Sequence, residues 1–356
     1  MKTKIIILVF LLVLGIGGYF AYDQFIKEDD KDINSNVATL GDQKDKLEDV
    51  WLCDGKEWIK QGNPTDAKPT EPCTEENSAF PKKNDEFEYL WSEMNQGPYH
   101  DKVTYATGTS LTSWTPSGTI LAEHASVPAG VIKDGVIYVY FVDVTTEGLP
   151  EQLGTVTSSD QGQTWTQQQV LTIEDIGDRA VADPDPVLLD DGRIRLFFFD
   201  INDARVNSTA DGIEPSSKVY SAISDDGVNF AMEEGVRFER DGSGIYDPDV
   251  NLFDDTWYLY GGTNEGNQVI YATSSDGLTF TEKGVAFTGG GVPDVYFENG
   301  LYYLFTAGIN IATGTVPTSF TDTGSQFRDS DSKGATADPS VIKLDDGTYL
   351  MVYKIQ

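Results

Sequence analysis

Aspartate residues stand beside a proline at the start of several apolar runs in this chain. The stretch VADPDPVLLDDGRIRLFFFD, residues 181–200, places Asp183 and Asp185 on either side of Pro184 and then becomes strongly apolar. Aspartate is depleted in β-strands. In such positions a carboxylate is expected to cap backbone groups, to bind a ligand or to do acid–base chemistry. The repeated Asp-Pro arrangement therefore provides the first candidates for a functional site.

The stretch is one of five related segments in the C-terminal two thirds of the chain, most of which carry an aspartate beside the proline. Each copy has a proline, an apolar run, a turn rich in Asp, Asn and Gly, and an aromatic-rich run, which is the pattern of a β-hairpin. The prolines are separated by 56, 64, 45 and 46 residues. Strand repeats at such periods predict the blades of a β-propeller. The five prolines are Pro128, Pro184, Pro248, Pro293 and Pro339.

A second pattern predicts the outer strands of each blade. Runs such as VIYATSSDGLTF, residues 269–280, indicate a strand, a Ser/Asp/Gly turn and another strand. The last repeat ends at Gln356 after its first hairpin, whereas residues 103–121 look like the missing second half. We therefore predict an all-β fold over residues 101–356: a five-bladed β-propeller closed by N-terminal strands that complete the last blade. Such closure removes an open sheet edge.

The composition limits the class of partner. Asp and Glu number 58 against 25 Lys and Arg, which gives a formal net charge of −33. A surface of this charge repels phosphate backbones, so we expect no nucleic-acid partner. It suits a protein that meets sugars, cations or cationic surfaces.

The first 24 residues predict membrane attachment. Lys2 and Lys4 precede apolar or small residues from Ile5 to Tyr22, a length close to that of a bilayer span. The absence of a cleavage site after Gly17 favours an uncleaved single-pass helix over a cleaved secretory signal. With the lysines inside, the bulk of the chain is extracytoplasmic. A cleaved signal would make the protein secreted.

Three segments are expected between this anchor and the propeller. Residues 25–48 read as a polar stalk and residues 76–100 as a polar linker. Residues 49–75 contain both cysteines of the chain, Cys53 and Cys73. Because two cysteines in an exported segment commonly pair, we predict a small disulfide-stapled hairpin there. A spacer role is favoured over a binding role for this hairpin.

Several motifs resemble those of known propellers. The turn SSDQGQTW, residues 158–165, looks like the Asp-box of sialidases, which is a structural turn on the side of the propeller away from the funnel. The strand starts ADPD, YDPDV and ADPSV resemble those of five-bladed glycoside hydrolases of the arabinanase and xylosidase family 43. The resemblance covers residues 101–356. It implies a glycoside hydrolase, or glycosidase, with carbohydrate as its partner.

The resemblance also implies residue roles. Family 43 has a base Asp, a pKa-tuning Asp and an acid Glu on successive channel strands. The stretch YDPDV assigns the tuning role to Asp247 and leaves Asp183 as the base candidate. The acid is expected in a Glu-Gly-Pro sequence, but this chain reads Gly-Val-Pro at residues 291–293. Asp294 and Glu265 are the candidates that substitute for the acid.

The residues themselves support acid–base chemistry in a funnel. Inner strands line the propeller channel, so the aspartates at their starts converge. Glycoside hydrolysis needs two carboxyl groups roughly 5–9.5 Å apart, and crowding raises the pKa of one of them. Because a proline separates its two flanking positions, we expect that both cannot face the channel fully. The candidate substrate-binding residues are Arg179, Tyr246, Asp249, Trp257, Asp338 and His124.

Other interpretations remain open at the level of sequence. The aspartates can act simply as caps of backbone N–H groups. The Gly at position 291 favours a non-catalytic carbohydrate-binding or surface-adhesion propeller. A sialidase is disfavoured because sialidases need three arginines that grip a carboxylate and have six blades, whereas this chain predicts five blades. We expect no required cofactor, although clustered carboxylates are able to hold a structural Ca²⁺.

Overall fold

The computed structural model describes residues 50–53, 58–61, 67–72, 97–146, 151–177, 179–201, 216–241, 244–263 and 267–356. The chain divides into an N-terminal unit, residues 1–97, and a C-terminal unit, residues 98–356. The predicted anchor over residues 1–24 and the predicted stalk over residues 25–48 lie outside the described residues.

The N-terminal unit contains a short β-hairpin. Strand β1 (Val50–Cys53) pairs antiparallel with β2 (Trp58–Gln61), and Cys53 lies opposite Trp58. Cys73 falls outside the described residues, so the disulfide with Cys53 stays a prediction.

Across the described ranges, none of the helices has the length and apolar character needed to span a bilayer.

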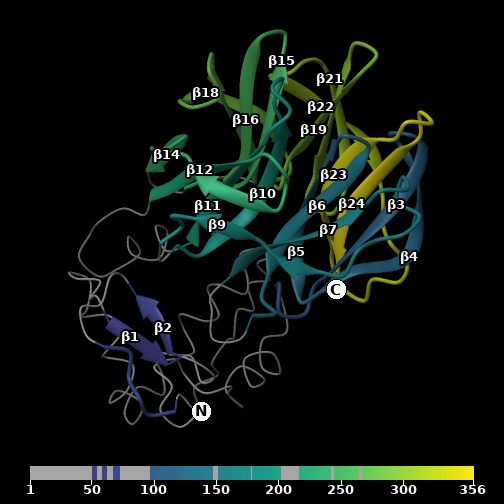
Figure 1. Ribbon diagram of the computed structural model, residues 1–356. Coiled ribbons are helices and arrows are strands. Elements are labelled where there is room, and N and C mark those ends of the chain that lie inside the picture. Colours follow the sequence, from purple (N-terminus) through teal and green to yellow (C-terminus); the bar gives the residue numbers. More distant parts are fainter. Residues whose placement is uncertain are drawn as a thin grey trace, which may run out of the picture. The chain divides into compact units, whose positions relative to one another are not determined.

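The C-terminal unit is an all-β, five-bladed propeller, as predicted. Neighbouring strands of the blades pair antiparallel, except that β9 (Thr172–Glu174) and β13 (Asn229–Met232) pair parallel. The inner strands contact one another in a cyclic order: β5 (Ala125–Lys133), β10 (Val181–Leu188), β15 (Tyr246–Phe253), β19 (Asp294–Glu298), β23 (Thr336–Lys343) and back to β5. Figure 1 shows the sheets side by side, and one sheet combines the yellow strands β23 and β24 with the blue strands β3 and β4. Alternating apolar residues and Asp/Gly turns build each hairpin.

The strands are assigned to blades as follows. Blade 1 contains β5 (Ala125–Lys133), β6 (Val136–Asp143), β7 (Gln152–Ser158) and β8 (Gln169–Val170). Blade 2 contains β10 (Val181–Leu188), β11 (Ile194–Asp200), β12 (Ser216–Ser224), β13 (Asn229–Met232), β9 (Thr172–Glu174) and β14 (Phe238–Asp241). Blade 3 contains β15 (Tyr246–Phe253), β16 (Thr256–Thr263), β17 (Gln268–Ser274) and β18 (Thr281–Thr288). Blade 4 contains β19 (Asp294–Glu298), β20 (Leu301–Thr306), β21 (Asn310–Val316) and β22 (Ser319–Gln326). Blade 5 contains β23 (Thr336–Lys343), β24 (Tyr349–Ile355), β3 (Lys102–Ser110) and β4 (Ser113–Glu123).

Blade 5 is assembled from both ends of the propeller sequence. Strand β24 pairs antiparallel with β3, with Val352 opposite Tyr105. The outer edge of blade 2 is covered in a similar way, because β9 precedes the blade in sequence and pairs parallel with β13. Both arrangements join neighbouring parts of the ring through backbone hydrogen bonds, which protects strand edges from pairing with other chains.

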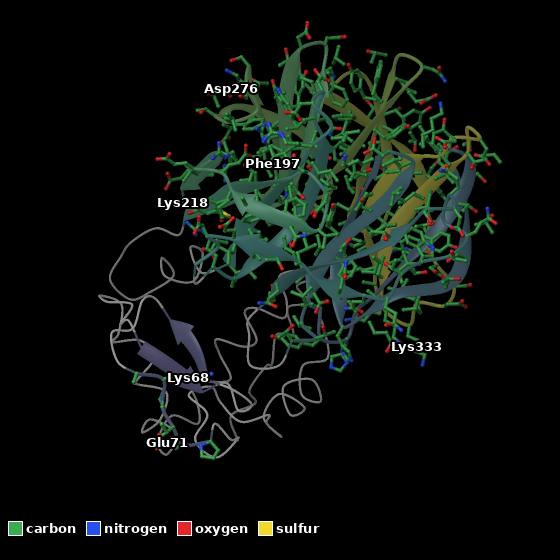
Figure 2. All side chains as sticks on the ribbon, viewed as in Figure 1. Lys68, Glu71, Phe197, Lys218, Asp276 and Lys333 are labelled. Atoms are coloured by element: carbon green, nitrogen blue, oxygen red, sulfur yellow. The ribbon has the colours of Figure 1, made fainter. Side chains whose placement is uncertain are left out.

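The hydrophobic core consists of five clusters, one between each pair of neighbouring blades. The cluster between blades 2 and 3 is typical: Phe197 and Val219 of blade 2 pack against Val250 and Leu259 of blade 3. Phe197 lies inside the propeller in Figure 2, whereas Asp276 lies at its outer edge. Because each cluster joins two blades, the blades stabilise one another rather than folding as separate sheets.

The predicted Asp-box turns sit against these clusters. In blade 2, Asp226 Oδ1 accepts the backbone N–H groups of Val228 and Asn229 at 2.9 and 2.8 Å. The Asn229 side chain and these backbone donors hold the pKa of Asp226 well below its usual value. Gly227 has φ +80°, and a Cβ there would lie 2.6 Å from the Tyr138 ring of blade 1. The turn is therefore a structural contact between blades.

We expect Asp226→Ala to lower the free energy of unfolding by about 1 kcal/mol, because two backbone donors lose their acceptor. Asp225→Ala is the matched control, since Asp225 is the exposed neighbouring acid in the same turn. Urea unfolding of both variants at neutral pH measures the difference. Equal stability of the two variants would show that the Asp-box hydrogen bonds contribute nothing.

Candidate functional site

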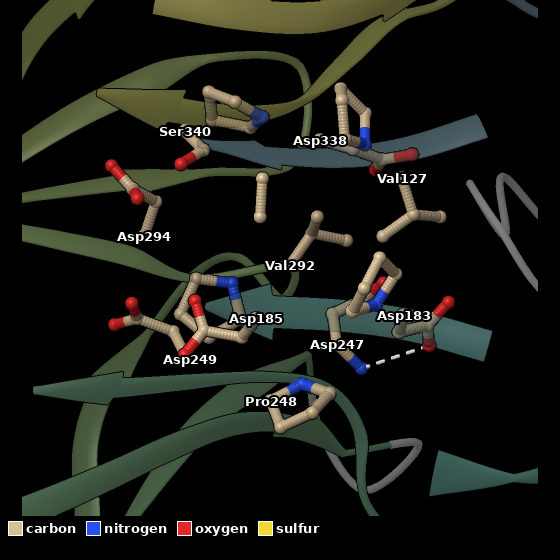
Figure 3. A pocket seen from close by; sticks show the side chains of 15 residues that line it. Val127, Asp183, Asp185, Asp247, Pro248, Asp249, Val292, Asp294, Asp338 and Ser340 are labelled. Carbon is tan, nitrogen blue, oxygen red and sulfur yellow. Dashed lines mark hydrogen bonds between the residues drawn. The ribbon is translucent and has the colours of Figure 1, made fainter. Parts of the chain in front are cut away.

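The inner strands enclose a small axial cavity lined by three consecutive residues from every blade. Its volume is about 30 Å³, room for about one water molecule. In Figure 3 the residues before each proline gather on one side, and those after it gather on the other. The lining comprises residues 127–129, 183–185, 247–249, 292–294 and 338–340. We call the first layer the pre-proline ring (Val127, Asp183, Asp247, Val292, Asp338) and the second the post-proline ring (Ala129, Asp185, Asp249, Asp294, Ser340).

A shared backbone distortion lets both rings line the cavity. Every residue of the pre-proline ring has a left-handed φ, between +48° and +55°. In four blades the pairing register shifts at this point, as it does between Ala182 and Asp185 in blade 2. A bulge of this kind re-aims side chains. The expectation that the two positions flanking each proline cannot both face the channel is therefore wrong.

The post-proline ring staples each blade to the next. Its polar side chains accept the backbone N–H of the residue two positions after the proline in the following blade. The N···O distances are 2.8 Å at Asp185, 3.0 Å at Asp249 and 3.1 Å at Ser340. The contacts run from Asp185 to Val250, Asp249 to Val295, Asp294 to Val341 and Ser340 to Gly130. Capping of backbone groups therefore explains why these carboxylates recur.

The fifth junction, between blades 1 and 2, lacks both partners of this hydrogen bond. Ala129 occupies the acceptor position and has no polar side chain. Pro186 occupies the donor position and has no N–H. The two exceptions match each other, so this hydrogen bond leaves neither a donor nor an acceptor unpaired at the junction.

Burial makes the post-proline carboxyls weaker acids than usual. It raises the pKa of Asp249 to about 8, against the opposing effect of the Val295 N–H and the Asn251 side chain. Burial and the nearby charge of Asp249 raise the pKa values of Asp185 and Asp294 well above the usual value. Asp294 Oδ2 is buried and has no hydrogen-bond partner. Asp249 is consequently mostly protonated at neutral pH.

Asp183 and Asp247 form a coupled pair in the pre-proline ring, at the opposite end of the cavity from Asp249. Asp183 Oδ2 accepts the backbone N–H of Asp247 at 3.2 Å, drawn as the dashed line in Figure 3. Burial raises the pKa of Asp183 to about 7. Burial and the charge of Asp183 raise the pKa of Asp247 well above its usual value. Asp183 can therefore change its protonation state near neutral pH, beside a carboxyl that is itself a weakened acid.

The remaining carboxyl of the pre-proline ring is neutralised by a lysine. Asp338 is 3% exposed, and its Oδ2 lies 2.9 Å from Lys354 Nζ. Asp338 therefore lines the cavity, as predicted for a residue of the funnel, but as half of a buried ion pair.

Tyr246 fills the space beside Gly291, the position at which the resemblance to family 43 predicts an acid. Its hydroxyl donates to the Thr263 carbonyl at 3.3 Å. A Cβ at Gly291 would lie 2.7 Å from this hydroxyl, and a Cβ at Gly262 would lie 2.4 Å from the ring. The two glycines thus form a slot for the Tyr246 ring. Any side chain at position 291 requires this ring to move.

Arg179 and His124 are not among the residues that line the axial cavity. The Arg179 guanidinium lies 4.9 Å from the centre of the Tyr220 ring and donates to the Ile176 carbonyl at 2.9 Å. His124 Nδ1 lies 2.6 Å from the Tyr99 carbonyl oxygen. Both side chains are thus engaged in contacts with the protein around the strand starts.

Trp257 and Glu265 also fall outside the cavity lining. Trp257 packs against the cluster between blades 2 and 3, and a Cβ at Gly277 of the blade 3 Asp-box would lie 2.8 Å from its ring. This placement is at the turn end of its blade, away from the pre-proline ring. Glu265 lies outside the described residues.

Sequence reasoning missed Lys354 and undervalued Asp185. Lys354 is the one cation in the strand YLMVYKI, an isolated charge in an apolar run that indicates a buried partner. Asp185 belongs to the same Asp-Pro motif as Asp183, but its role as a staple depends on Val250 in the next blade.

Carboxylates cluster at the axis, and carboxylate oxygens are the ligands that hard cations such as Ca²⁺ take. Within the described ranges, no group of three or more His, Cys, Asp or Glu side chains has a geometry suited to a metal ion. Hydrogen bonds to backbone N–H groups hold Asp183, Asp185 and Asp249, and an ion pair with Lys354 holds Asp338.

Comparison with known proteins supports the fold. No protein-family model and no curated protein sequence matches this chain. An α-L-arabinofuranosidase from Clostridium thermocellum is 18% identical over 64% of this chain and 80% of its own, with a TM-score of 0.51. A thermostable family-43 glycoside hydrolase is 15% identical over 64% of this chain and 83% of its own, with a TM-score of 0.52. An endo-1,4-β-xylanase from Bacteroides thetaiotaomicron is 16% identical over 64% of this chain and 84% of its own, with a TM-score of 0.51. The predicted resemblance to family 43 propellers is thus confirmed at the level of fold.

We expect the propeller to lose stability as the pH rises from about 4 to about 8. The folded pKa of Asp249, about 8, lies above its ordinary value, so the folded state binds more protons in this window. The stabilisation is complete below the unfolded pKa and disappears as the pH passes the folded pKa. The measurement is the melting temperature as a function of pH. Asp249→Asn should flatten this dependence, because its amide oxygen still accepts the Val295 N–H and does not titrate.

Asp255→Asn is the matched control, since Asp255 lies in an exposed hairpin turn of the same blade. We expect it to leave the slope unchanged. A slope that is identical in Asp249→Asn and the parent would contradict the assignment of protons to the post-proline ring.

Proposed function

We propose that this chain is a glycoside hydrolase that acts on glycans at the pre-proline end of the funnel, with Asp183 as its general base. The observation that carries the proposal is the coupled Asp183–Asp247 pair, in which the pKa of Asp183 is raised to about 7. A general base works best when its pKa lies near the operating pH. Asp247 would act as the tuning residue, because it lies beside Asp183 and donates its backbone N–H to the Asp183 carboxylate.

The size of the cavity decides where a sugar would bind. Ligand sites typically enclose 300–1,000 Å³, whereas the axial cavity measures about 30 Å³. A sugar ring would therefore rest over the pre-proline ring and would not reach the post-proline ring. This favours Asp183 over Asp294 as a residue that contacts substrate, and it leaves Asp249 and Asp294 as staples. Tyr246 stands beside Asp247 and would contact the sugar from the rim.

The substrate class is proposed from the matched folds. The similar structures with the highest TM-scores include an α-L-arabinofuranosidase and an endo-1,4-β-xylanase. We therefore propose arabinose- or xylose-containing glycans, in which a water molecule deprotonated by Asp183 attacks the anomeric carbon. The chain has 58 acidic and 25 basic residues, and the resulting negative charge is compatible with such neutral substrates.

The missing acid would shape the activity. Without a carboxylic acid at Gly291, no group there protonates the departing oxygen. Substrates whose leaving group needs no proton should then be hydrolysed faster than natural glycans. Glu265, which lies outside the described residues, remains the proposed substitute for the acid.

Glycan binding without hydrolysis is the second candidate function. It is favoured by one observation, the Tyr246 hydroxyl within 2.7 Å of the Cβ position of Gly291. In this alternative the ring replaces the acid, and the funnel mouth serves as a recognition surface.

The cellular location is also a proposal. Lys2, Lys4 and the apolar residues that follow support an uncleaved membrane anchor with the propeller on the extracytoplasmic side. The predicted Cys53–Cys73 disulfide agrees with this location, because disulfides persist in oxidising compartments.

Hydrolysis of activated aryl glycosides tests the base. With the full chain, we expect dinitrophenyl arabinofuranosides or xylosides to turn over, and methyl glycosides of the same sugars to turn over at least about 100-fold more slowly, because only the methyl leaving group needs an acid. The rate should rise as the pH passes about 7, where Asp183 ionises. Asp183→Asn should reduce turnover by a factor of about 100 or more.

Asp190→Asn is the control for this experiment, because Asp190 lies in an exposed hairpin turn of the same blade. Glycan affinity is measured in parallel by calorimetry. Binding without turnover of any substrate would favour the second candidate function. Neither binding nor turnover would refute both.

Reconstruction of the acid tests the role of Tyr246. We expect Gly291→Glu alone to destabilise the propeller, because its Cβ meets the Tyr246 hydroxyl at 2.7 Å. The double variant Gly291→Glu/Tyr246→Phe removes that oxygen and should recover stability. If Asp183 is a working base, the double variant should also gain activity on methyl glycosides. A Gly291→Glu variant as stable as the parent would contradict the proposed clash.

A further inference from the structure

A buried lysine lies directly behind the wall of the funnel. Lys354 is 4% exposed, and its Nζ lies 2.9 Å from Asp338 Oδ2 and 3.1 Å from Asp101 Oδ2. The same Nζ donates to Ser126 Oγ at 3.3 Å, and Ser126 Oγ donates to Asp101 at 2.7 Å. Of these four residues, only Asp338 lines the axial cavity.

The network stands where the ring closes. Lys354 and Asp338 belong to blade 5, Ser126 belongs to blade 1, and Asp101 precedes β3. Burial opposes the charge of Lys354, but the two carboxylates outweigh it and raise the lysine pKa above its usual value. A buried ion pair is costly to break, because the remaining partner becomes an uncompensated charge. The ammonium group of Lys354 thus contacts the residues that close the ring and also balances the charge of Asp338 at the funnel.

We propose that Lys354 is a positioning residue of the funnel, which fixes Asp338 through the ion pair and so controls the electrostatic field that acts on Asp183. The relevance of this field to catalysis rests on the proposed function of Asp183 as a base. The effect of the field on the pKa of Asp183 does not depend on that function, because it is present in the protein without substrate.

The charged groups around Asp183 and Asp247 determine how the pKa of Asp183 should change when Lys354 or Asp338 is replaced. Asp338 and Glu151 raise the pKa of Asp183, and Lys354 lowers it. Asp247 experiences the same opposition between Asp338 and Lys354. Loss of the Lys354 charge should therefore raise the pKa of Asp183, and loss of the Asp338 charge should lower it.

A purely structural role predicts a different pattern. Loosening of the ring would admit water to the funnel, and hydration returns a buried carboxyl toward its ordinary pKa of about 4. Both Lys354→Met and Asp338→Asn would then lower the pKa of Asp183. The direction of the change in Lys354→Met separates the two roles.

The experiment is a pH titration of the full chain by carboxyl ¹³C NMR. The Asp183 resonance is identified as the signal that disappears in Asp183→Asn. In the parent its midpoint is expected near pH 7. We expect Lys354→Met to raise the midpoint by about one pH unit and Asp338→Asn to lower it by about one pH unit. Lys102→Met, which breaks the exposed pair between Lys102 and Glu123, is the control and should leave the midpoint unchanged.

If Lys354→Met alone does not fold, the double variant Asp338→Asn/Lys354→Met replaces it, since removal of both partners of a buried pair is tolerated better than removal of one. Its midpoint should lie about one pH unit above that of Asp338→Asn. A lower or unchanged midpoint on loss of the lysine, in either background, would overturn the proposal. Because the readout needs no turnover, a protein that hydrolyses no glycoside still tests Lys354.

Discussion

Backbone N–H groups of the inner strands lie next to a narrow axis, where little water can reach them, and the whole propeller depends on their being satisfied. An unpaired buried N–H costs free energy comparable to a lost hydrogen bond. Here the acceptors are the side chains that follow the prolines, such as Asp185 and Asp249, each reaching across to the next blade. The same contacts fix the distance and register between neighbouring blades. The matched exception at Ala129 and Pro186 shows how closely donor and acceptor depend on each other.

This constraint creates the chemistry of the funnel. Carboxyls that are required for backbone satisfaction crowd around a cavity of about 30 Å³, and burial raises their pKa values. The left-handed residue before each proline turns a second set of side chains into the same space. Asp183 and Asp247 belong to this second set, and Asp183 also accepts the backbone N–H of Asp247 in the next blade. Both carboxyls line the cavity at the pre-proline end, where a ligand at the mouth could meet them.

The funnel combines a retained base candidate with a filled acid position. Tyr246 lies in a slot formed by Gly262 and Gly291, and the slot exists because neither position carries a Cβ. The slot lies at blades 3 and 4. Lys354 adds a fixed positive charge elsewhere in the ring, where blade 5 meets blade 1. A fold shared with glycosidases does not by itself fix the function, which depends on the residues at the site.

Sequence periodicity alone was sufficient for the fold class, because each blade repeats a hairpin with turn residues at fixed positions and each strand start carries a proline. It also identified Asp183, Asp247 and Asp338 as funnel residues, since strand starts converge in a propeller. It could not separate staples from candidate catalytic groups, because the N–H that Asp249 accepts lies 46 residues away at Val295. It placed Trp257 beside the sugar although the ring packs under an Asp-box glycine. Only the tertiary structure decided these assignments, because charge compensation, burial and hydrogen bonding at the axis arise between blades and not within any one of them.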